Sequence, residues 1–291
     1  MLFPADFLKR VEYLSIISKR VFQGTLLAQR RSRQTGTGVE FADHREYVAG
    51  DDLRYLDWNV YARHGSLLIK RFQAETDLRI FILLDCSGSM QTGSPSKFDL
   101  ARQLAAALSY IALSDLDRVS IIPFADTAFR EFPLTRGKAR IVPVMNFLSQ
   151  LSATGNRTQL RSAVDFLLTR HAEQGLVILI SDFFDDTGFE HSLDLLRCSP
   201  METNVVQIYA AEEANPEVTG DVELVDSETG ATRRIRVTEN TRSEYLRRFH
   251  AHLSSLAAYC VRHRISCVQA SSDSRYDELI VNMMKTAGVA P

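Results

Sequence analysis

Residues 78–90 read LRIFILLDCSGSM, and the predicted architecture is organised around them. The stretch up to Asp85 is apolar almost throughout, as expected of a central parallel strand that is covered on both faces. A loop with two serines and a glycine begins directly after it. Farther along, apolar strands alternate with amphipathic helices. This alternation predicts an α/β fold with a doubly wound, mostly parallel sheet flanked by helices.

The predicted elements follow one another in a regular order. A helix starting near Ser94-Pro95 precedes a strand at RVSIIPF (118–124), which completes a crossover unit. The run FREFPL (129–134) is predicted as an edge strand because its proline cannot donate to a ladder. A helix from about Thr158 leads into the apolar strand LVILIS (176–181). The other predicted elements are a helix at 138–150, a strand at 204–210, an inserted β-hairpin at about 220–238, a long helix, a last strand at 266–270 and a closing helix at 275–287.

The N-terminal part of the chain has a different pattern. Residues 1–76 are predicted to form an N-terminal helix and a small module, and residues 77–287 the main α/β domain. Apolar residues of the helix recur at spacings that line one face, so it is expected to dock on the protein itself. In the module, the turn signals QTGTG and AGDD separate short apolar-aromatic runs, which indicates partly β structure.

Charge and cysteine usage exclude several classes of protein. The chain has 34 Lys and Arg against 36 Asp and Glu, so no global positive field favours nucleic acid or an anionic membrane. A basic cluster at Arg30, Arg31 and Arg33 is interpreted as a solvated or partner-facing loop. Four cysteines without a C-x-x-C pair fit reduced thiols. The sequence contains neither a secretory signal nor an apolar run near the ~20 residues of a membrane span, so a cytoplasmic protein without membrane insertion is expected.

The loop after the first apolar strand carries oxygen donors. Asp85, Ser87 and Ser89 supply one carboxylate and two hydroxyls, and Gly88 permits a tight backbone path. Mg²⁺ prefers about six such hard oxygen ligands, so these three form an incomplete shell. The alternative is a hydrogen-bonded turn, because Ser and Asp commonly satisfy backbone groups at a strand end.

The predicted topology brings two further oxygen donors to the same place. In a doubly wound sheet, the strand order reverses beside the first strand and opens a crevice at the carboxyl ends of the strands. Asp85 ends the first strand, and Asp182 ends the strand LVILIS, which is expected to begin the other half of the sheet. Thr158 lies in the loop before the helix that leads into that strand. Together the five residues favour a divalent-cation site over a structural turn.

This set of residues resembles the metal-ion-dependent adhesion site of the von Willebrand factor A-type family, whose pattern is D-x-S-x-S, then a threonine, then an aspartate. The resemblance implies that Ser87, Ser89 and Thr158 bind Mg²⁺, or else Mn²⁺ or Ca²⁺, through their hydroxyls, and that Asp85 and Asp182 act largely through water. In that family an acidic side chain of a partner protein completes the metal shell. The chain is therefore expected to be a non-enzymatic, metal-dependent interaction or adaptor protein.

The segment before the α/β domain is similar to that of the bacterial domain-of-unknown-function family 58. The family's sequence elements are matched at Gly38–Phe41, Arg45–Tyr47, Gly50–Arg54, Asp57–Trp58 and Ala62–Arg63. The resemblance implies a MoxR-type AAA+ ATPase, or its substrate, as the partner that offers a carboxylate. Many relatives carry transmembrane helices ahead of this segment, so this chain is expected to be a soluble variant.

The charged residues of the same segment have two interpretations. They form either a salt-bridged network that fixes the first module to the sheet or a partner-binding surface. The network is favoured because neighbouring opposite charges usually satisfy each other. The residues concerned are Glu40, Arg45, Asp51, Asp52, Arg54, Asp57 and Arg63.

A metal-dependent phosphoester hydrolase with Asp85 as nucleophile is the alternative function. The common aspartyl-phosphatase arrangement has a second aspartate two residues farther on, where this chain has Ser87. The sequence also lacks a P-loop, a nucleophile elbow and an H-E-x-x-H motif. An interaction protein is therefore favoured over an enzyme.

Overall fold

The computed structural model describes residues 2–4, 6–15, 35–36, 40–73, 78–126, 130–155, 157–185, 187–225 and 230–289. The chain divides into two compact units. The first consists of Met1–Ser18 together with Leu78–Pro291, and the second is Lys19–Asp77. The basic cluster Arg30–Arg33 lies outside the described residues.

The N-terminal helix belongs to the α/β unit, whereas the sequence grouped it with the N-terminal module. Its described part covers residues 7–15. Phe7 and Val11 are buried, and the Phe7 ring centroid lies 4.9 Å from that of Tyr276, close to the chain's other end. The apolar stripe predicted docking correctly, but a stripe does not identify the surface on which a helix docks.

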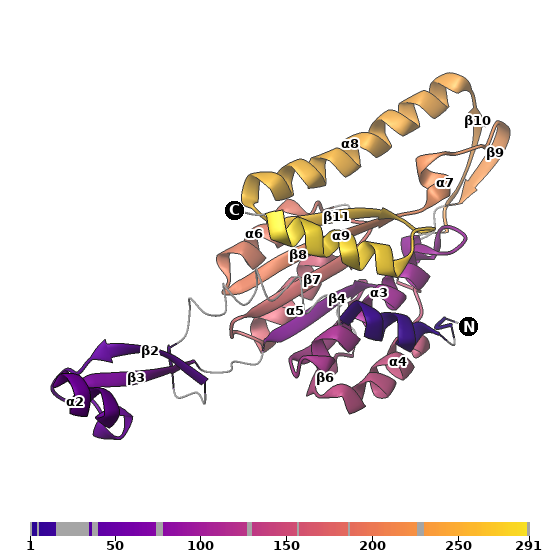
Figure 1. Cartoon of the computed structure of the whole chain (residues 1–291). Coiled ribbons are helices and arrows are strands. Elements are labelled where there is room, and N and C mark those ends of the chain that lie inside the picture. Colours follow the sequence, from indigo (N-terminus) through magenta and orange to yellow (C-terminus); the bar gives the residue numbers. More distant parts are fainter. Residues whose placement is uncertain are drawn as a thin grey trace. The chain divides into compact units, whose positions relative to one another are not determined.

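The main unit contains the predicted doubly wound sheet (Figure 1). Its strand order is β11-β8-β7-β4-β5-β6, and β6 is the antiparallel edge strand. The first apolar strand, β4, pairs in parallel with β5 on one side and with β7 on the other. The strands are β4 (Arg79–Asp85), β5 (Arg118–Phe124), β6 (Phe132–Arg136), β7 (Gly175–Ser181), β8 (Met201–Tyr209) and β11 (Ser266–Ser271).

Helices cover both faces of this sheet, which explains why β4 is apolar throughout (Figure 1). Phe81 and Leu83 pack in a core with α5, α6 and α8. The chain's other long helix, α3, contacts β4 and β5 and packs against α4 and α9. The helices are α3 (Lys97–Ser114), α4 (Ile141–Gln150), α5 (Leu160–Arg170), α6 (Glu190–Cys198), α7 (Ala211–Ala214), α8 (Glu239–His263) and α9 (Tyr276–Val289), with short 3-10 turns η2 (Gly88–Gln91) and η3 (Lys138–Arg140).

Helix α3 begins at Lys97, slightly later than the Ser94-Pro95 start that the sequence indicated. The Ser96 side chain caps it by accepting a hydrogen bond from the Asp99 backbone N–H. Lys97 is therefore the first residue of the helix, directly after the loop that carries the serines.

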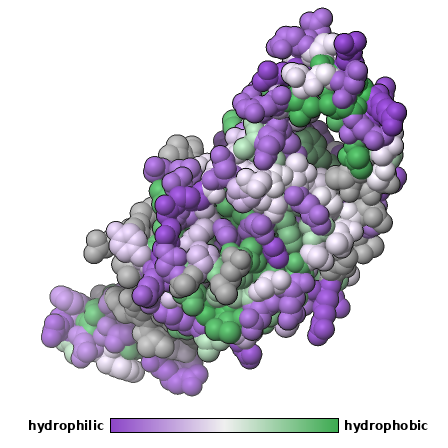
Figure 2. Space-filling model, turned by 90° about the vertical axis from the view of Figure 1, so that its right-hand side faces the viewer, coloured by the Kyte–Doolittle hydropathy of each residue, from purple (hydrophilic) through white to green (hydrophobic). Residues whose placement is uncertain are grey.

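The predicted inserted hairpin is present as β9 (Gly220–Val225) and β10 (Thr232–Val237), an antiparallel pair that precedes α8. Most of its side chains are exposed, with hydrophobic Leu224 and Val225 among charged residues. Figure 2 shows the mixture of hydrophilic and hydrophobic side chains on this side of the molecule. Among the helices of the described residues, none has the length and apolar character needed to span a bilayer.

The second unit is small and partly β, as predicted. It contains the sheet β1-β3-β2 and one short helix. Arg45 forms a bidentate pair with Asp51 at 2.6 Å, while Asp57 caps the helix and bonds His44 at 2.9 Å. These pairs join residues of this unit to one another, and the expectation that such charges fix the unit to the sheet stays a prediction. The elements are β1 (Thr35–Gly36), β2 (Glu40–Glu46), η1 (Leu53–Tyr55), α2 (Trp58–His64) and β3 (Leu68–Gln73).

Candidate metal centre

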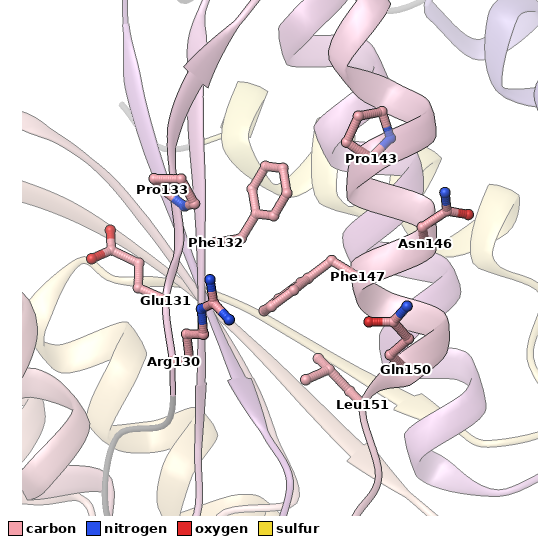
Figure 3. A pocket seen from close by; sticks show the side chains of 9 residues that line it. All are labelled: Arg130, Glu131, Phe132, Pro133, Pro143, Asn146, Phe147, Gln150 and Leu151. Atoms are coloured by element: carbon pink, nitrogen blue, oxygen red, sulfur yellow. The ribbon is translucent and has the colours of Figure 1, made fainter.

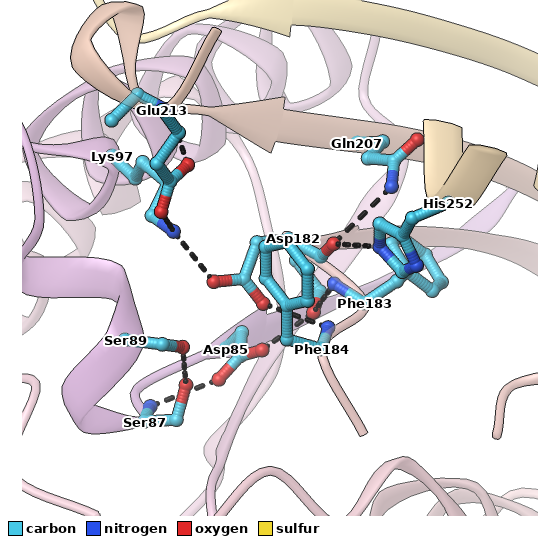
Figure 4. A network of polar contacts seen from close by, with 12 residues as sticks. Asp85, Ser87, Ser89, Lys97, Asp182, Phe183, Phe184, Gln207, Glu213 and His252 are labelled. Atoms are coloured by element: carbon cyan, nitrogen blue, oxygen red, sulfur yellow. Dashed lines mark hydrogen bonds and ion pairs between the residues drawn. The ribbon is translucent and has the colours of Figure 1, made fainter. Parts of the chain in front are cut away.

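The carboxyl end of β4 positions the first three candidate ligands (Figure 4). Asp85 and Ser87 are fully buried, and Ser89 is half-buried in η2. The Ser87 backbone N–H donates to Asp85 Oδ1 at 2.9 Å, and the Oγ atoms of Ser87 and Ser89 lie 3.0 Å apart. Ser181, the last residue of β7, donates its hydroxyl to Asp85 Oδ2 at 2.5 Å. A compact cluster of oxygen atoms therefore sits where β4 and β7 end.

The loop that carries Thr158 lies against this cluster. The Gly88 N–H donates to Gly155 O at 2.8 Å, and the Gly155 N–H donates to Cys86 O at 3.2 Å. Thr158, three residues farther on, is buried. Helix α5, which follows Thr158, contacts the loop after β7, because the Leu160 N–H donates to the Asp185 carboxylate at 2.9 Å. Backbone bonds thus join the Thr158 loop to the loop after β4, and a bond to the Asp185 side chain joins it to the loop after β7, as the predicted topology requires.

Gly155 is needed for this close approach. A Cβ atom at position 155 would collide with the Cβ of Ala125, while Gly155 also faces the Cys86 carbonyl. We expect Gly155→Ala to destabilise the α/β unit by about 1–3 kcal/mol, the usual cost of overpacking, as measured by urea denaturation. The double variant G155A/A125G removes the colliding atom and should recover most of this loss. A single variant as stable as the wild type would contradict the described loop contact.

Asp182 follows β7, and both of its carboxylate oxygens accept hydrogen bonds. The Phe184 N–H donates to Oδ1 at 3.1 Å, and the ammonium of Lys97 donates to Oδ2 at 2.8 Å. Lys97 donates a second bond of 2.8 Å to Glu213 of α7. The side chains of Lys97 and Asp182 are both 0% exposed. Burial alone lowers the pKa of an ammonium, but the charges of Asp182 and Glu213 outweigh it and raise the pKa of Lys97, so it stays protonated.

Asp85 has no cation beside it to offset the cost of its ionised form among the contacts that the structure describes for its carboxylate. Burial, followed by the nearby charge of Asp182, raises the pKa of Asp85 to about 7. The hydrogen bonds from Ser181 and Ser87 only partly oppose this rise. A divalent cation bound by the neighbouring hydroxyls would compensate the charge, and every donor in the set is a hard oxygen of the kind that Mg²⁺ takes. Both the charge and the donor chemistry of these residues fit such an ion.

Several residues of the site were not predicted. Ser181 gave no signal beyond its position before Asp182, and Lys97 was placed in a helix predicted to start near Ser94-Pro95, without a role. Gln207 and His252 both approach the Asp182 backbone carbonyl, at 3.2 Å each. A lysine at a helix N-terminus is electrostatically unfavourable, so Lys97 was the one residue whose position could have signalled a role.

A separate surface hollow of about 520 Å³ lies between β6 and α4 (Figure 3). None of its lining residues belongs to the Asp85 cluster, and the acidic Glu131 at its edge is already bonded by Ser120 and His171. The described residues hold no group of three His, Cys, Asp or Glu side chains arranged for a metal ion. Hydroxyl oxygens are therefore essential to the proposed ligand set.

The chain is similar to proteins of known sequence and of known structure. The chain is 25% identical to the uncharacterized protein Rv1480 of Mycobacterium tuberculosis over 248 residues, which are 84% of this chain and 78% of that protein. Solved structures similar to it include BatB from Bacteroides thetaiotaomicron (17% identity, 72% of this chain and 98% of that chain, TM-score 0.46). Another is the SpRpn10 VWA domain (11% identity, 71% and 95%, TM-score 0.41). The family model described as "Protein of unknown function DUF58" matches residues 43–255, well over half of the sequence, so the chain belongs to the DUF58 family.

Proposed function

We propose that this chain is a non-enzymatic, metal-dependent adaptor that binds an acidic side chain of a partner protein. The observation that carries the proposal is the meeting of hydroxyl and carboxylate oxygens at the ends of β4 and β7, where the carboxyl group of Asp85 is buried. In this proposal Ser87, Ser89 and Thr158 hold Mg²⁺ directly. A bound divalent cation would supply a coordination position that a partner's carboxylate can fill.

The surroundings of the site support protein recognition. Phe184, two residues after Asp182, leaves 40% of its surface exposed, and its ring stacks on His252 with centroids 4.4 Å apart. Aromatic side chains beside a charged contact are common in protein interfaces. Following the sequence resemblance, we propose a MoxR-type AAA+ ATPase, or a substrate of it, as the partner.

Hydrolysis with Asp85 as the nucleophile fits the site less well. Asp85 is 0% exposed, and its two oxygens accept bonds from the Ser87 N–H and the Ser181 hydroxyl. A nucleophile needs an oxygen aimed at the reacting atom of a substrate. Asp85 is better suited to orient the serine loop and to contribute charge.

The proposal is tested by capture of partners from a cell extract of the source bacterium in the presence of Mg²⁺ or EDTA. We expect a partner that binds the wild type in Mg²⁺, is released by EDTA, and binds the Ser89→Ala variant at least tenfold more weakly, since a lost metal ligand or its supporting contact commonly costs 10–100-fold in metal affinity. Asp165→Asn, on the exposed face of α5, is the matched control and should bind like the wild type. Binding that is unaffected by both EDTA and Ser89→Ala would refute the proposal.

A further inference from the structure

Lys97 occupies a position that the stability of its helix does not explain. It is the first residue of α3, where the helix macrodipole disfavours a cation. Its side chain is nevertheless completely buried, which normally costs several kcal/mol for an unpaired ammonium. The two carboxylates that it contacts, Asp182 and Glu213, offset most of these costs.

The ammonium is held on several sides (Figure 4). Glu213 is itself fixed, because its second oxygen accepts a bond from the Ala210 N–H at 2.7 Å. The Phe184 ring centroid lies 5.5 Å from Lys97 Nζ, within the range of a cation–π contact. These contacts fix the position of the Lys97 ammonium. A movement of the Asp182 carboxylate toward the serine loop would therefore break its bond to Lys97.

We propose that Lys97 is a positioning residue that prevents Asp182 from becoming a direct ligand of the cation and so leaves a coordination position open to the partner. This inference rests on the proposed function. Asp182 has one oxygen bonded to Lys97 and the other to the Phe184 N–H. Direct coordination would require Asp182 to give up or strain at least the stronger, charge-assisted of these bonds.

The consequence for the metal follows from electrostatics. A carboxylate that binds a cation directly strengthens the metal site but lowers the cation's remaining attraction for another anion. A carboxylate held one water away leaves that attraction for the ligand that arrives last. Lys97 thus lowers the affinity of the site for the metal alone and raises the affinity of the metal-bound protein for an acidic partner.

The test compares two variants whose expected effects have opposite signs. In the double variant K97M/E213L, one positive and one negative charge disappear together, so the net charge is unchanged while Asp182 is released. We expect Mn²⁺ to bind this variant roughly tenfold more tightly than the wild type, at the lower end of the effects seen for residues that support metal ligands. In Glu213→Gln, Lys97 keeps Asp182 as its only carboxylate partner, and Mn²⁺ binding should weaken.

Two measurements are made on the full chain. Isothermal titration gives the Mn²⁺ affinity, and the luminescence lifetimes of bound Eu³⁺ in H₂O and D₂O give the number of inner-sphere waters. The double variant should hold about one water fewer than the wild type, because Asp182 takes its place. If Lys97 had a purely structural role, the number of inner-sphere waters would not change. The Mn²⁺ affinity would also not rise in one variant and fall in the other.

The possible results distinguish this inference from the proposed function. If the wild type binds Mn²⁺ but both variants bind it more weakly with an unchanged number of waters, the role of Lys97 is refuted and the metal site stands. If the wild type binds no Mn²⁺, the proposed function itself fails. Should the double variant not fold, a Glu213→Gln variant that binds Mn²⁺ as tightly as or more tightly than the wild type refutes the inference.

Discussion

Replacing Asp85 with asparagine is expected to stabilise the metal-free protein at pH 8 and, at the same time, to abolish its stabilisation by Mg²⁺. Burial and the charge of Asp182 raise the pKa of Asp85 from 3.8 to about 7. Because the pKa is higher in the folded state, the contribution of Asp85 to stability is fully present below about pH 4. It is lost as the pH rises to about 7 and the folded protein must accept the buried charge.

The size of this effect is set by the shift in the pKa. Each pKa unit corresponds to about 1.4 kcal/mol, so the rise to about 7 sets an upper limit of about 4 kcal/mol for metal-free protein above that pH. We expect D85N to raise the free energy of unfolding of the metal-free protein by about 1–4 kcal/mol at pH 8. The neutral amide carries no buried charge and can still accept the hydrogen bond from the Ser87 N–H. Bound Mg²⁺ should recover a similar amount in the wild type through preferential binding to the folded state.

Urea denaturation from pH 4 to pH 8, in EDTA and in excess Mg²⁺, measures both effects. In EDTA the free energy of unfolding of D85N should exceed that of the wild type increasingly toward pH 8, and in Mg²⁺ the difference should shrink or reverse. Asp165→Asn, an exposed carboxylate paired with Arg161, is the control. Equal stabilisation of wild type and D85N by Mg²⁺ would show that Asp85 does not contribute to cation binding.

The meeting of Asp85 and Asp182 was predictable because it follows from topology. Both residues end apolar strands that had to be parallel and adjacent, and the sheet places β4 beside β7. The same reasoning located the Thr158 loop, since it leads into the helix before β7. Local sequence patterns fix such strand ends because hydrophobic periodicity and crossover connections leave few alternatives.

The contacts of Lys97 were not predictable in this way. Its partners Asp182 and Glu213 are 85 and 116 residues away, and neither spacing has a periodic signature. Side-chain pairing across a domain depends on tertiary packing, to which a single sequence gives little access. The N-terminal helix shows the same limit, because its stripe predicted burial without revealing that the surface belongs to the α/β unit.

The ion pairs of Lys97 predict a large loss of stability when this lysine is replaced. Lys97→Met is expected to destabilise the protein by about 3–5 kcal/mol in EDTA, because removing one partner of a buried pair leaves a charge without compensation. Asp182 is the main source of this cost, since its side chain is 0% exposed whereas that of Glu213 is 17% exposed. Urea denaturation at pH 8 measures the loss.

The double variant K97M/E213L should recover only the smaller part of that loss, because it removes the charge of Glu213 but leaves the buried Asp182 without its cation. Asp182 keeps its bond from the Phe184 N–H in both variants, so the difference between them isolates the charge of Glu213. Mg²⁺ should stabilise Lys97→Met more than it stabilises the wild type, since it supplies positive charge beside the released Asp182. A single variant that loses less than about 1 kcal/mol, the range of an exposed ion pair, would show that Lys97 is not held between buried carboxylates.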